Sequence, residues 1–417
     1  MNHHAITHCR MCGSQALEEV WDLGSQFVTD FVAPGQEGFR APLVLLFCHA
    51  CRLAQLKHTV DRDLMYKTYY YRSSVSETMR AALTDVADRA MDAVMPAGMT
   101  ALKDWRYLKP DTTVLDIGAN DGYLLSRYPV SFHRVAVEPA KNIEVEPGAA
   151  NAVVRDYFSY DAVAPALPRG KAMISTSVAV FYDVDAPRPF VHDLARLLEP
   201  DGVWVLQMNF TPPVMRANAF DFISHEHLTY WTLPTLQDLL RYEDLEVYDV
   251  EELPLNGGTY RVFIQHRGAR QVTEHARELI RRDMECETPE AWHALKARVD
   301  RNGDVLRAML AGYAARGQRV FVAGASTRGN SLLQYYGLGV AELPFASDRD
   351  PRKAGRKMVG TDIPVISEEE AYAMKPDAWL LLPYSYLAQF LKRDREVFRA
   401  KSTFIVPLPD VMAVRGE

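Results

Sequence analysis

A glycine-rich segment with two acids, Asp116-Ile117-Gly118-Ala119-Asn120-Asp121-Gly122, follows a short apolar run and precedes a helix-like pattern. Glycines let the backbone approach a ligand where a side chain would collide, and a carboxylate at a strand end can hold a cationic or hydroxyl-bearing group. One strand-helix-strand unit downstream, a second apolar run ends in Glu138, where ribose hydroxyls need an acceptor. The two patterns predict a nucleotide-type pocket formed by a strand, a loop and a helix.

The loop departs from the dinucleotide-binding pattern. It lacks the G-x-G-x-x-G spacing that seats a pyrophosphate on a helix N-terminus, and Asn120 and Asp121 stand where a phosphate would meet an acid. S-adenosylmethionine (SAM) carries a ribose, an adenine, an amino-acid tail and a positive sulfonium, and it has no phosphate. We therefore predict SAM as the ligand, with a buried strand-turn-helix that binds nothing as the alternative.

Four of the five cysteines form two C-x-x-C pairs, Cys9 with Cys12 and Cys48 with Cys51. Four thiolates can close a tetrahedral zinc site, and Gly13 suits the tight turn of such a knuckle. In a reducing compartment this interpretation is preferred to two disulfides or a redox pair. Because four sulfurs leave no open coordination position, we predict a structural zinc ion with no part in the chemistry.

The composition narrows the class of protein. A chain of 417 residues with 48% hydrophobic content can bury more than one core, which favours two or three domains. The formal net charge of -7 argues against nucleic acid as a partner. The sequence shows no membrane-spanning run and no signal peptide, so we expect a cytoplasmic protein without a membrane partner. The oligomeric state stays open, and a monomer is compatible with these observations.

Strand-like and helical runs alternate through the middle of the chain, which predicts a mostly parallel sheet with helices on both faces. The predicted strands are Thr113–Ile117, Arg134–Glu138, Ala172–Thr176, Val203–Asn209 and Arg261–His266. A second strand, small-residue turn and helix start begins near Arg319. We expect five segments: a zinc-binding module (1–60), a helical connector with a tyrosine-rich ligand wall (61–105), a SAM-binding domain (106–266), a second helical connector (267–315) and a C-terminal nucleotide-type α/β domain (316–417).

Two polar clusters could contribute to a site. Ser224-His225-Glu226-His227 lies between a predicted strand and a helix that begins near Leu233, above the carboxyl edge of the sheet. A histidine there can take a proton near neutral pH, and a neighbouring glutamate can orient a ring or a sugar hydroxyl. We prefer His227 as the base, while a metal-binding pair or a structural loop histidine are alternatives. Tyr69-Tyr70-Tyr71 could form a ligand wall or pack between modules.

Motifs in one fixed order along nearly the whole chain carry a resemblance to a known family. They are Cys9-Arg10-Met11-Cys12-Gly13-Ser14, the second cysteine pair, Tyr71-Arg72-Ser73-Ser74, the loop at 116–122, His225-Glu226-His227, Asn256-Gly257-Gly258-Thr259, the turn at 324–330, Asp348-Arg349-Asp350-Pro351 and the segment 360–365. The chain resembles the zinc-containing, SAM-dependent C-methyltransferases that act on nucleotide-linked keto-deoxysugars in antibiotic biosynthesis.

The resemblance implies an N-terminal zinc-binding module, a central Rossmann-like class I methyltransferase domain and a C-terminal Rossmann-like α/β domain, with the nucleotide sugar between the last two. It implies that His227 removes the proton next to the sugar ketone and that the enolate carbon then takes the methyl group. The implied catalytic residues are His227, Glu226, His225 and Tyr182. The implied SAM-binding residues are Tyr71, Ser73, Asp116, Gly118, Asn120, Asp121 and Glu138. The implied substrate-binding residues are Ser224, Asn256, Arg328 and Asn330.

The chain departs from the family pattern where the acceptor should bind. Ser224 replaces a usual tyrosine, Tyr182 stands where a histidine is common, and Tyr384-Ser385 replaces a Trp-His pair. Tyr182 could supply the missing phenol or could only fill the volume of the histidine. Two alternative functions follow: methylation of a non-sugar metabolite or of an oxygen or nitrogen atom, and a non-catalytic scaffold that binds zinc and a nucleotide.

Overall fold

The predicted apolar runs become neighbouring strands of one central sheet. The computed structural model describes residues 2–28, 31–33, 35–69, 71–95, 108–109, 111–255 and 257–416. The sheet runs in the order β13 (Leu245–Leu253), β14 (Thr259–His266), β11 (Leu198–Asn209), β10 (Ala172–Val178), β7 (Thr113–Ile117), β8 (His133–Val137) and β9 (Ala152–Val154). The strands from β9 to β11 are parallel, and β14 is antiparallel to both of its neighbours. The predicted mostly parallel sheet is confirmed, and β9 and β13 are additional to it.

Alternating side chains let both faces of this sheet be covered by helices. Val114 contributes to a core with α2 (Glu77–Ala93), whereas its neighbour Leu115 belongs to the larger core that contains the buried residues of α5 (Pro187–Leu197) and α7 (Leu233–Leu240). Successive strand residues point to opposite faces, so a strand that is covered on both faces is mostly apolar, as the sequence Thr-Val-Leu-Asp-Ile of β7 is. Thr113–Ile117 is buried at every position, which explains why its bounds could be read from the sequence.

The helix predicted directly after the glycine-rich loop is wrong. Only a short 3-10 turn, η3 (Leu125–Arg127), follows the loop before β8 begins at His133. Leu124 and Leu125 pack in the same core as Leu83 and Val86 of α2. An α-helix from earlier in the sequence therefore covers this part of the sheet.

The N-terminal module shares strands with the rest of the protein. A four-stranded antiparallel sheet has the order β12 (Thr229–Tyr230), β5 (Ala54–Leu56), β4 (Arg40–Cys48) and β2 (Leu17–Phe27). β12 begins two residues after the His225-Glu226-His227 segment, so this segment is anchored to the module. Two small pairs complete the module: β1 (His3–Ala5) with β6 (His58–Val60), and β3 (Phe31–Val32) with β17 (Lys357–Met358).

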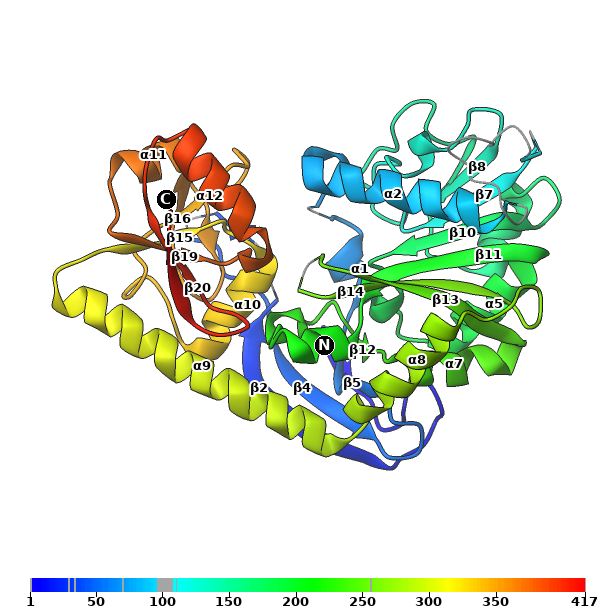
Figure 1. Ribbon diagram of the computed structural model, residues 1–417, viewed down its shortest axis with the longest axis horizontal. Helices are drawn as coiled ribbons and strands as arrows, with labels where there is room; N and C mark the ends of the chain where they lie inside the picture. Colours follow the sequence, from blue (N-terminus) through cyan, green and yellow to red (C-terminus); the bar gives the residue numbers. More distant parts are fainter. Residues whose placement is uncertain are drawn as a thin grey trace.

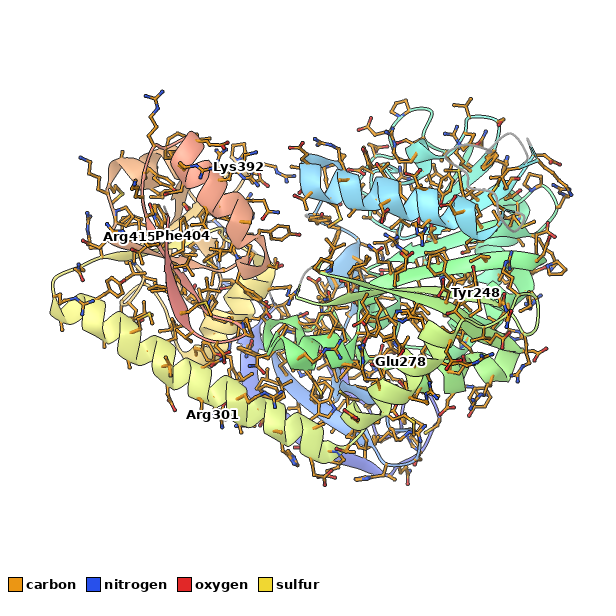
Figure 2. The ribbon with its side chains drawn as sticks, in the orientation of Figure 1. Tyr248, Glu278, Arg301, Lys392, Phe404 and Arg415 are labelled. Atoms are coloured by element: carbon orange, nitrogen blue, oxygen red, sulfur yellow. The ribbon has the colours of Figure 1, made fainter. Side chains whose placement is uncertain are left out.

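The C-terminal lobe is built around a second, mainly parallel sheet. Its order is β18 (Val365–Ser367), β16 (Ala346–Asp348), β15 (Val320–Ala323), β19 (Ala378–Leu381), β20 (Thr403–Val406) and β21 (Met412–Arg415), and only the β20–β21 pair is antiparallel. Its helices are α10 (Thr327–Tyr336), α11 (Glu368–Ala373) and α12 (Leu387–Glu396). Phe404, labelled in Figure 2, is buried in its core together with Phe321 and Trp379.

Figure 1 shows the C-terminal lobe and the central sheet as two lobes, joined below by the long helix α9 (Pro289–Ala315) and the strands of the N-terminal module. The other helices within the described ranges are α1 (Arg62–Tyr66), α4 (Tyr160–Val163), α6 (Thr211–Arg216) and α8 (Glu274–Asp283). The 3-10 turns near the site are η1 (Ser73–Val75), η5 (Phe181–Asp183), η6 (Phe220–Phe222) and η9 (Tyr384–Tyr386). The sequence-derived domain boundaries remain our proposal. In the described ranges, no helix is both long enough and apolar enough to cross a bilayer.

Candidate functional site

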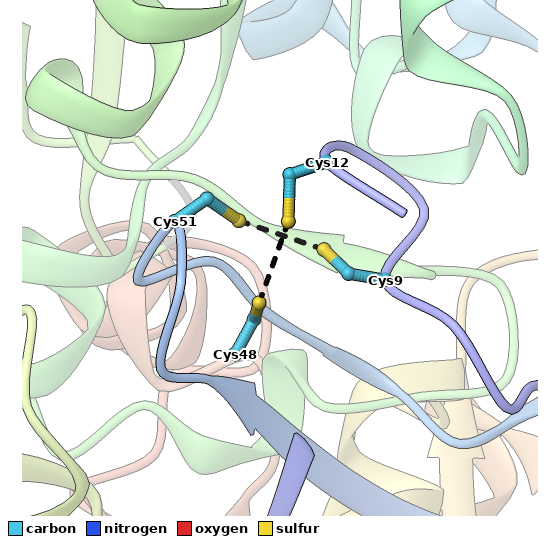
Figure 3. Close-up of side chains that lie close together, drawn as sticks. All are labelled: Cys9, Cys12, Cys48 and Cys51. Carbon is cyan, nitrogen blue, oxygen red and sulfur yellow. Dashed lines mark hydrogen bonds between the residues drawn. The ribbon is translucent and has the colours of Figure 1, made fainter. Parts of the chain in front are cut away.

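The four predicted zinc ligands converge on one point (Figure 3). All four Sγ atoms lie within 4.8 Å of one another, with 3.5 Å between Cys9 and Cys51 and 3.6 Å between Cys12 and Cys48. Tetrahedral zinc with bonds of about 2.3 Å places its sulfurs about 3.8 Å apart, so the donor set fits this ion. Among the described residues, this is the one group of three or more His, Cys, Asp or Glu side chains able to hold a metal.

Two matching turns shape the cluster. The N–H of Gly13 donates to the Cys9 carbonyl at 2.9 Å, and the N–H of Arg52 donates to the Cys48 carbonyl at 2.7 Å. Both Gly13 (φ +74°) and Arg52 (φ +66°) adopt the left-handed conformation. The knuckle predicted at Gly13 is therefore present, and Arg52 forms its counterpart without a glycine.

A cavity of about 950 Å³ opens beyond the carboxyl ends of β7, β8 and β10, where parallel sheets bind ligands. The predicted SAM-binding residues that line it are Tyr71, Ser73, Asp116, Gly118, Asn120 and Glu138. Asp121 is not among the described residues of its wall. The volume is near the upper end of the roughly 300–1,000 Å³ of small-molecule sites, which leaves room for part of an acceptor beside a cofactor.

The glycine-rich loop has a conformation that few residues could adopt. Gly118 has φ +75°, and a Cβ there would lie 2.4 Å from a methyl carbon of Val180. The carboxylate of Glu138 accepts from the backbone N–H of Asn120 at 2.8 Å and from that of Ala140 at 2.7 Å. Burial raises the pKa of Glu138. This acid therefore holds the loop, while the second lone pair of each oxygen can still accept a ribose hydroxyl.

The side chains of Asn120 and Asp121 tie a distant segment to the loop. The Asn120 Oδ1 atom accepts from the Ser73 N–H at 3.0 Å, and its Nδ2 donates to the Tyr71 carbonyl at 3.1 Å. Asp121 Oδ2 accepts from the Ser74 N–H at 2.9 Å. The structure thus brings together Ser73 and Asn120, which are almost 50 positions apart in the sequence. Asp121 does not line the cavity, but it hydrogen-bonds to Ser74, next to the lining residue Ser73.

The three polar residues of the 225–227 segment point to different partners. His225 Nε2 lies 3.0 Å from the Ala41 carbonyl on β4, and burial lowers its pKa to about 4. His227 Nδ1 lies 2.6 Å from the Phe222 carbonyl, and burial lowers its pKa to about 3. Among the residues that the structure describes, neither histidine belongs to a group of three or more side chains able to hold a metal, so the alternative of a metal-binding pair gains no support. His225 and Glu226 line the cavity.

His227 is neutral at physiological pH and its tautomer is defined. A carbonyl partner requires the proton on Nδ1, so the Nε2 lone pair is the proton acceptor. His227 is not among the described residues that line the cavity, but its neighbours Glu226 and Leu228 are, and 9% of the His227 surface remains exposed. The ring of Tyr182 packs 4.2 Å from the His227 ring, centroid to centroid.

A second cavity of about 440 Å³ lies at the start of α10 in the C-terminal lobe. Its wall contains Ser326, Arg328, Lys353 and Tyr384. Five residues line both cavities: Met65, Tyr69, Tyr71, Glu226 and Tyr386. The two spaces are therefore adjacent, and the tyrosine segment forms part of the partition between them.

Arg328 is held by a partner that sequence reasoning missed. Asp221 is 2% exposed and accepts from Arg328 Nε at 3.1 Å and from Nη2 at 3.0 Å. The Tyr384 hydroxyl donates to the same carboxylate at 2.9 Å. The sequence contained one signal for this contact: Asp221 stands between two phenylalanines, Phe220 and Phe222, which predicts a buried carboxylate. A buried carboxylate requires a partner.

Two other predicted substrate-binding residues, Asn330 and Ser224, are placed less favourably. Asn330 is buried inside the C-terminal lobe, where its Nδ2 donates to the Val359 carbonyl at 2.9 Å. Ser224 is buried and, with Asn330, is absent from the described residues that line the two cavities. Asn256 and the middle tyrosine of the predicted wall, Tyr70, lie outside the described residues.

Comparison with known proteins connects these features. Residues 9–66 match a family model of a zinc binding domain, residues 81–250 match a methyltransferase domain, and residues 254–409 match the C-methyltransferase C-terminal domain. The chain is also 26% identical to the C-methyltransferase NovU of Streptomyces niveus, over 99% of this chain and 98% of that protein. This chain therefore has, in sequence order, a zinc binding domain, a methyltransferase domain and a C-methyltransferase C-terminal domain. It is a SAM-dependent methyltransferase with a structural zinc site.

Solved structures resemble parts of this C-methyltransferase at low identity. The SAH-bound calicheamicin biosynthesis methyltransferase CalO1 is 12% identical, with a TM-score of 0.31 over 45% of this chain and 57% of that chain. The mitomycin 7-O-methyltransferase MmcR is 15% identical, with a TM-score of 0.31 over 45% of this chain and 54% of that chain. The assignment of the three domains does not depend on either of these partial likenesses.

Asp116 of this C-methyltransferase gives a pH-dependent prediction. Burial raises its pKa from 3.8 to about 7, and its Oδ1 accepts from the Thr176 hydroxyl at 2.6 Å. Between pH 4 and 7 the folded state therefore binds more protons than the unfolded state, so this group lowers the free energy of unfolding as pH rises. Asp116→Asn keeps an acceptor for Thr176. We expect Asp116→Asn to raise the thermal unfolding midpoint at pH 8. The corresponding gain in the free energy of unfolding should be at most about 4 kcal/mol.

The control is the same comparison at pH 4, where wild type and Asp116→Asn should unfold at similar temperatures. Isothermal titration with S-adenosylhomocysteine (SAH) should show weaker binding by the variant, because a carboxylate that is costly to bury is retained for its ligand. A stability difference that is equal at pH 4 and pH 8 would contradict the prediction.

Proposed function

We propose that this enzyme adds a methyl group to a carbon next to the ketone of a nucleotide-linked keto-deoxysugar. The observation that carries the proposal is the shared wall between the two cavities. One cavity contains the predicted SAM-binding loop, the other contains the start of α10, and Glu226 and Tyr69 line both. An acceptor anchored in the C-terminal cavity could therefore present its sugar ring to the methyl donor.

The C-terminal cavity has the chemistry of a diphosphate site. The N-terminus of α10 offers backbone N–H groups and the positive end of a helix dipole. Arg328 and Lys353 line the same space. Each cation has a carboxylate partner, Asp221 for Arg328 and Asp348 for Lys353, which fixes its position in the wall. These groups support a phosphate-bearing acceptor over an uncharged metabolite.

His227 would act as the base. Its Nε2 would take the proton from the carbon next to the ketone, and the electron pair of that C–H bond would form the enolate. Bound SAM supplies the methyl group to this carbon. Glu226 would orient the sugar from the shared wall, and the aromatic partition would hold the ring in line. These roles account for a neutral imidazole with a defined tautomer.

The first experiment is an assay of the purified protein with SAM and a panel of nucleotide-linked keto-deoxysugars, read by mass spectrometry. We expect one sugar nucleotide to gain a single methyl group while SAM is converted to SAH. Titration with a nucleoside diphosphate alone should show binding that weakens in Arg328→Gln. Methylation of only non-sugar acceptors, or of an oxygen or nitrogen, would overturn the proposal. SAM binding without any turnover would favour the non-catalytic alternative.

A further inference from the structure

The turn η6 carries two contacts that belong to different parts of the site. Asp221, in its middle, forms the paired contact with Arg328 of the C-terminal lobe. The carbonyl of the next residue, Phe222, holds His227 Nδ1 at 2.6 Å. Asp221, the carboxylate partner of Arg328, is thus the chain neighbour of Phe222, whose carbonyl fixes the tautomer of His227.

Aromatic packing reinforces this connection. The Phe222 ring lies 4.3 Å from the His227 ring, centroid to centroid, and the Arg328 guanidinium carbon lies 6.0 Å from the Phe222 ring. His227 is also packed against Tyr182. The Phe222 side chain therefore lies between the Arg328 guanidinium and the His227 imidazole. A shift of η6 would move both the Phe222 carbonyl and the Phe222 ring, which contact His227.

We propose that Asp221 is a positioning residue that couples the diphosphate side of the site to His227 through the turn η6. The proposal rests on the proposed function for its substrate, but the contacts themselves do not depend on it. Binding of a diphosphate beside Arg328 would alter the electrostatic attraction between Arg328 and Asp221. Because Phe222 follows directly, the orientation of His227 would respond to an occupied C-terminal cavity.

Electrostatics acts in the same direction. Burial lowers the pKa of His227, and the positive charge of Arg328 lowers it further, while the contact with the Phe222 carbonyl raises it. The groups that face the imidazole are Tyr182, Phe222 and the charge of Arg328. A bound diphosphate would offset the arginine charge, so His227 would become more basic when the acceptor is present.

A purely structural role for Asp221 is the competing explanation. Removing one partner of a buried ion pair is destabilising wherever it lies, so lost stability alone cannot separate the two roles. Asp221→Asn retains the shape and one acceptor oxygen, and it removes the charge. Tyr384→Phe is the matched control, because it deletes another hydrogen bond to the same carboxylate and leaves the ion pair in place.

The first test needs no acceptor. The ¹⁵N resonances of His227, assigned by comparison with His227→Gln, report which ring nitrogen carries the proton. We expect Nδ1–H in the wild type and in Tyr384→Phe, and a mixture of tautomers in Asp221→Asn. Inorganic pyrophosphate should shift the His227 signals in the wild type and leave them unchanged in Asp221→Asn. An unaltered His227 spectrum in folded Asp221→Asn would overturn the coupling.

The second test follows proton removal without methyl transfer. With SAH in place of SAM, the acceptor identified above should exchange the hydrogen next to its ketone for deuterium. We expect Asp221→Asn to slow this exchange at saturating acceptor by about tenfold to 100-fold, with SAH affinity unchanged. A higher KM for the acceptor with an unchanged exchange rate at saturation would show that Asp221 only helps to bind the acceptor in the C-terminal cavity, and it would contradict the coupling. Absence of exchange in the wild type would instead count against the proposed function.

Discussion

Replacing His227 by glutamine is expected to lower kcat by about 10²–10⁴-fold, the usual contribution of a general base. Glutamine retains a side-chain donor for the Phe222 carbonyl, which His227 contacts at 2.6 Å, but it cannot accept the substrate proton. The affinity for SAH should stay within a few-fold of wild type, because His227 is not among the described residues of the SAM cavity. Deuterium exchange of the acceptor with SAH bound should fall in parallel with kcat.

Two matched variants make this result specific. His225→Gln alters the contact with the Ala41 carbonyl and should cost about 1–3 kcal/mol of stability, while kcat falls less than it does in His227→Gln. Glu226→Gln tests the other proton acceptor near the shared wall, and we expect a higher KM with a smaller loss of kcat. If Glu226→Gln abolished exchange and His227→Gln did not, the carboxylate would be the base.

Local patterns predicted the features that a few neighbouring residues determine. Thr113–Ile117 was predicted as a strand because a short, mostly apolar run is typical of a strand that is covered on both faces, and all five residues are buried. Cys9 and Cys12 predict one half of a zinc site because a two-residue spacing orients both sulfurs. Glu138 follows a strand next to the glycine-rich loop, so its place at the carboxyl edge follows from parallel pairing.

The remaining features depend on contacts between distant residues. Leu83 and Val86 of α2 cover the sheet beside the loop, and nothing local to the loop predicts a short 3-10 turn in place of a helix. The Asn120 side chain looks like a ligand group in the sequence, but its partners are Ser73 and Tyr71, which only the folded chain brings near. Asp221 lies 107 positions from Arg328, so their pairing has no local signal.

Cys48→Ser is expected to remove the zinc ion and with it the fold of the N-terminal module. Cys48 ends β4, and a structural zinc ion contributes about 10–16 kcal/mol of apparent binding free energy, comparable to the whole stability of a domain. Metal content, measured by native mass spectrometry, should fall to zero, and thermal unfolding should begin at lower temperature. Cys286→Ser, a change outside the cluster, should retain both zinc and stability.

The loss should reach the loop formed by His225-Glu226-His227, because β12, which follows this loop, lies in the same sheet as strands of the module. β12 pairs with β5, and it begins two residues after His227. His225 also contacts the Ala41 carbonyl of β4, and Thr59 of β6 lines the SAM cavity. An unfolded module would therefore release the loop and open one side of the cavity, so SAH affinity and turnover should both fall. A zinc-free Cys48→Ser protein that binds SAH as the wild type does would show that the central sheet holds the site without the module.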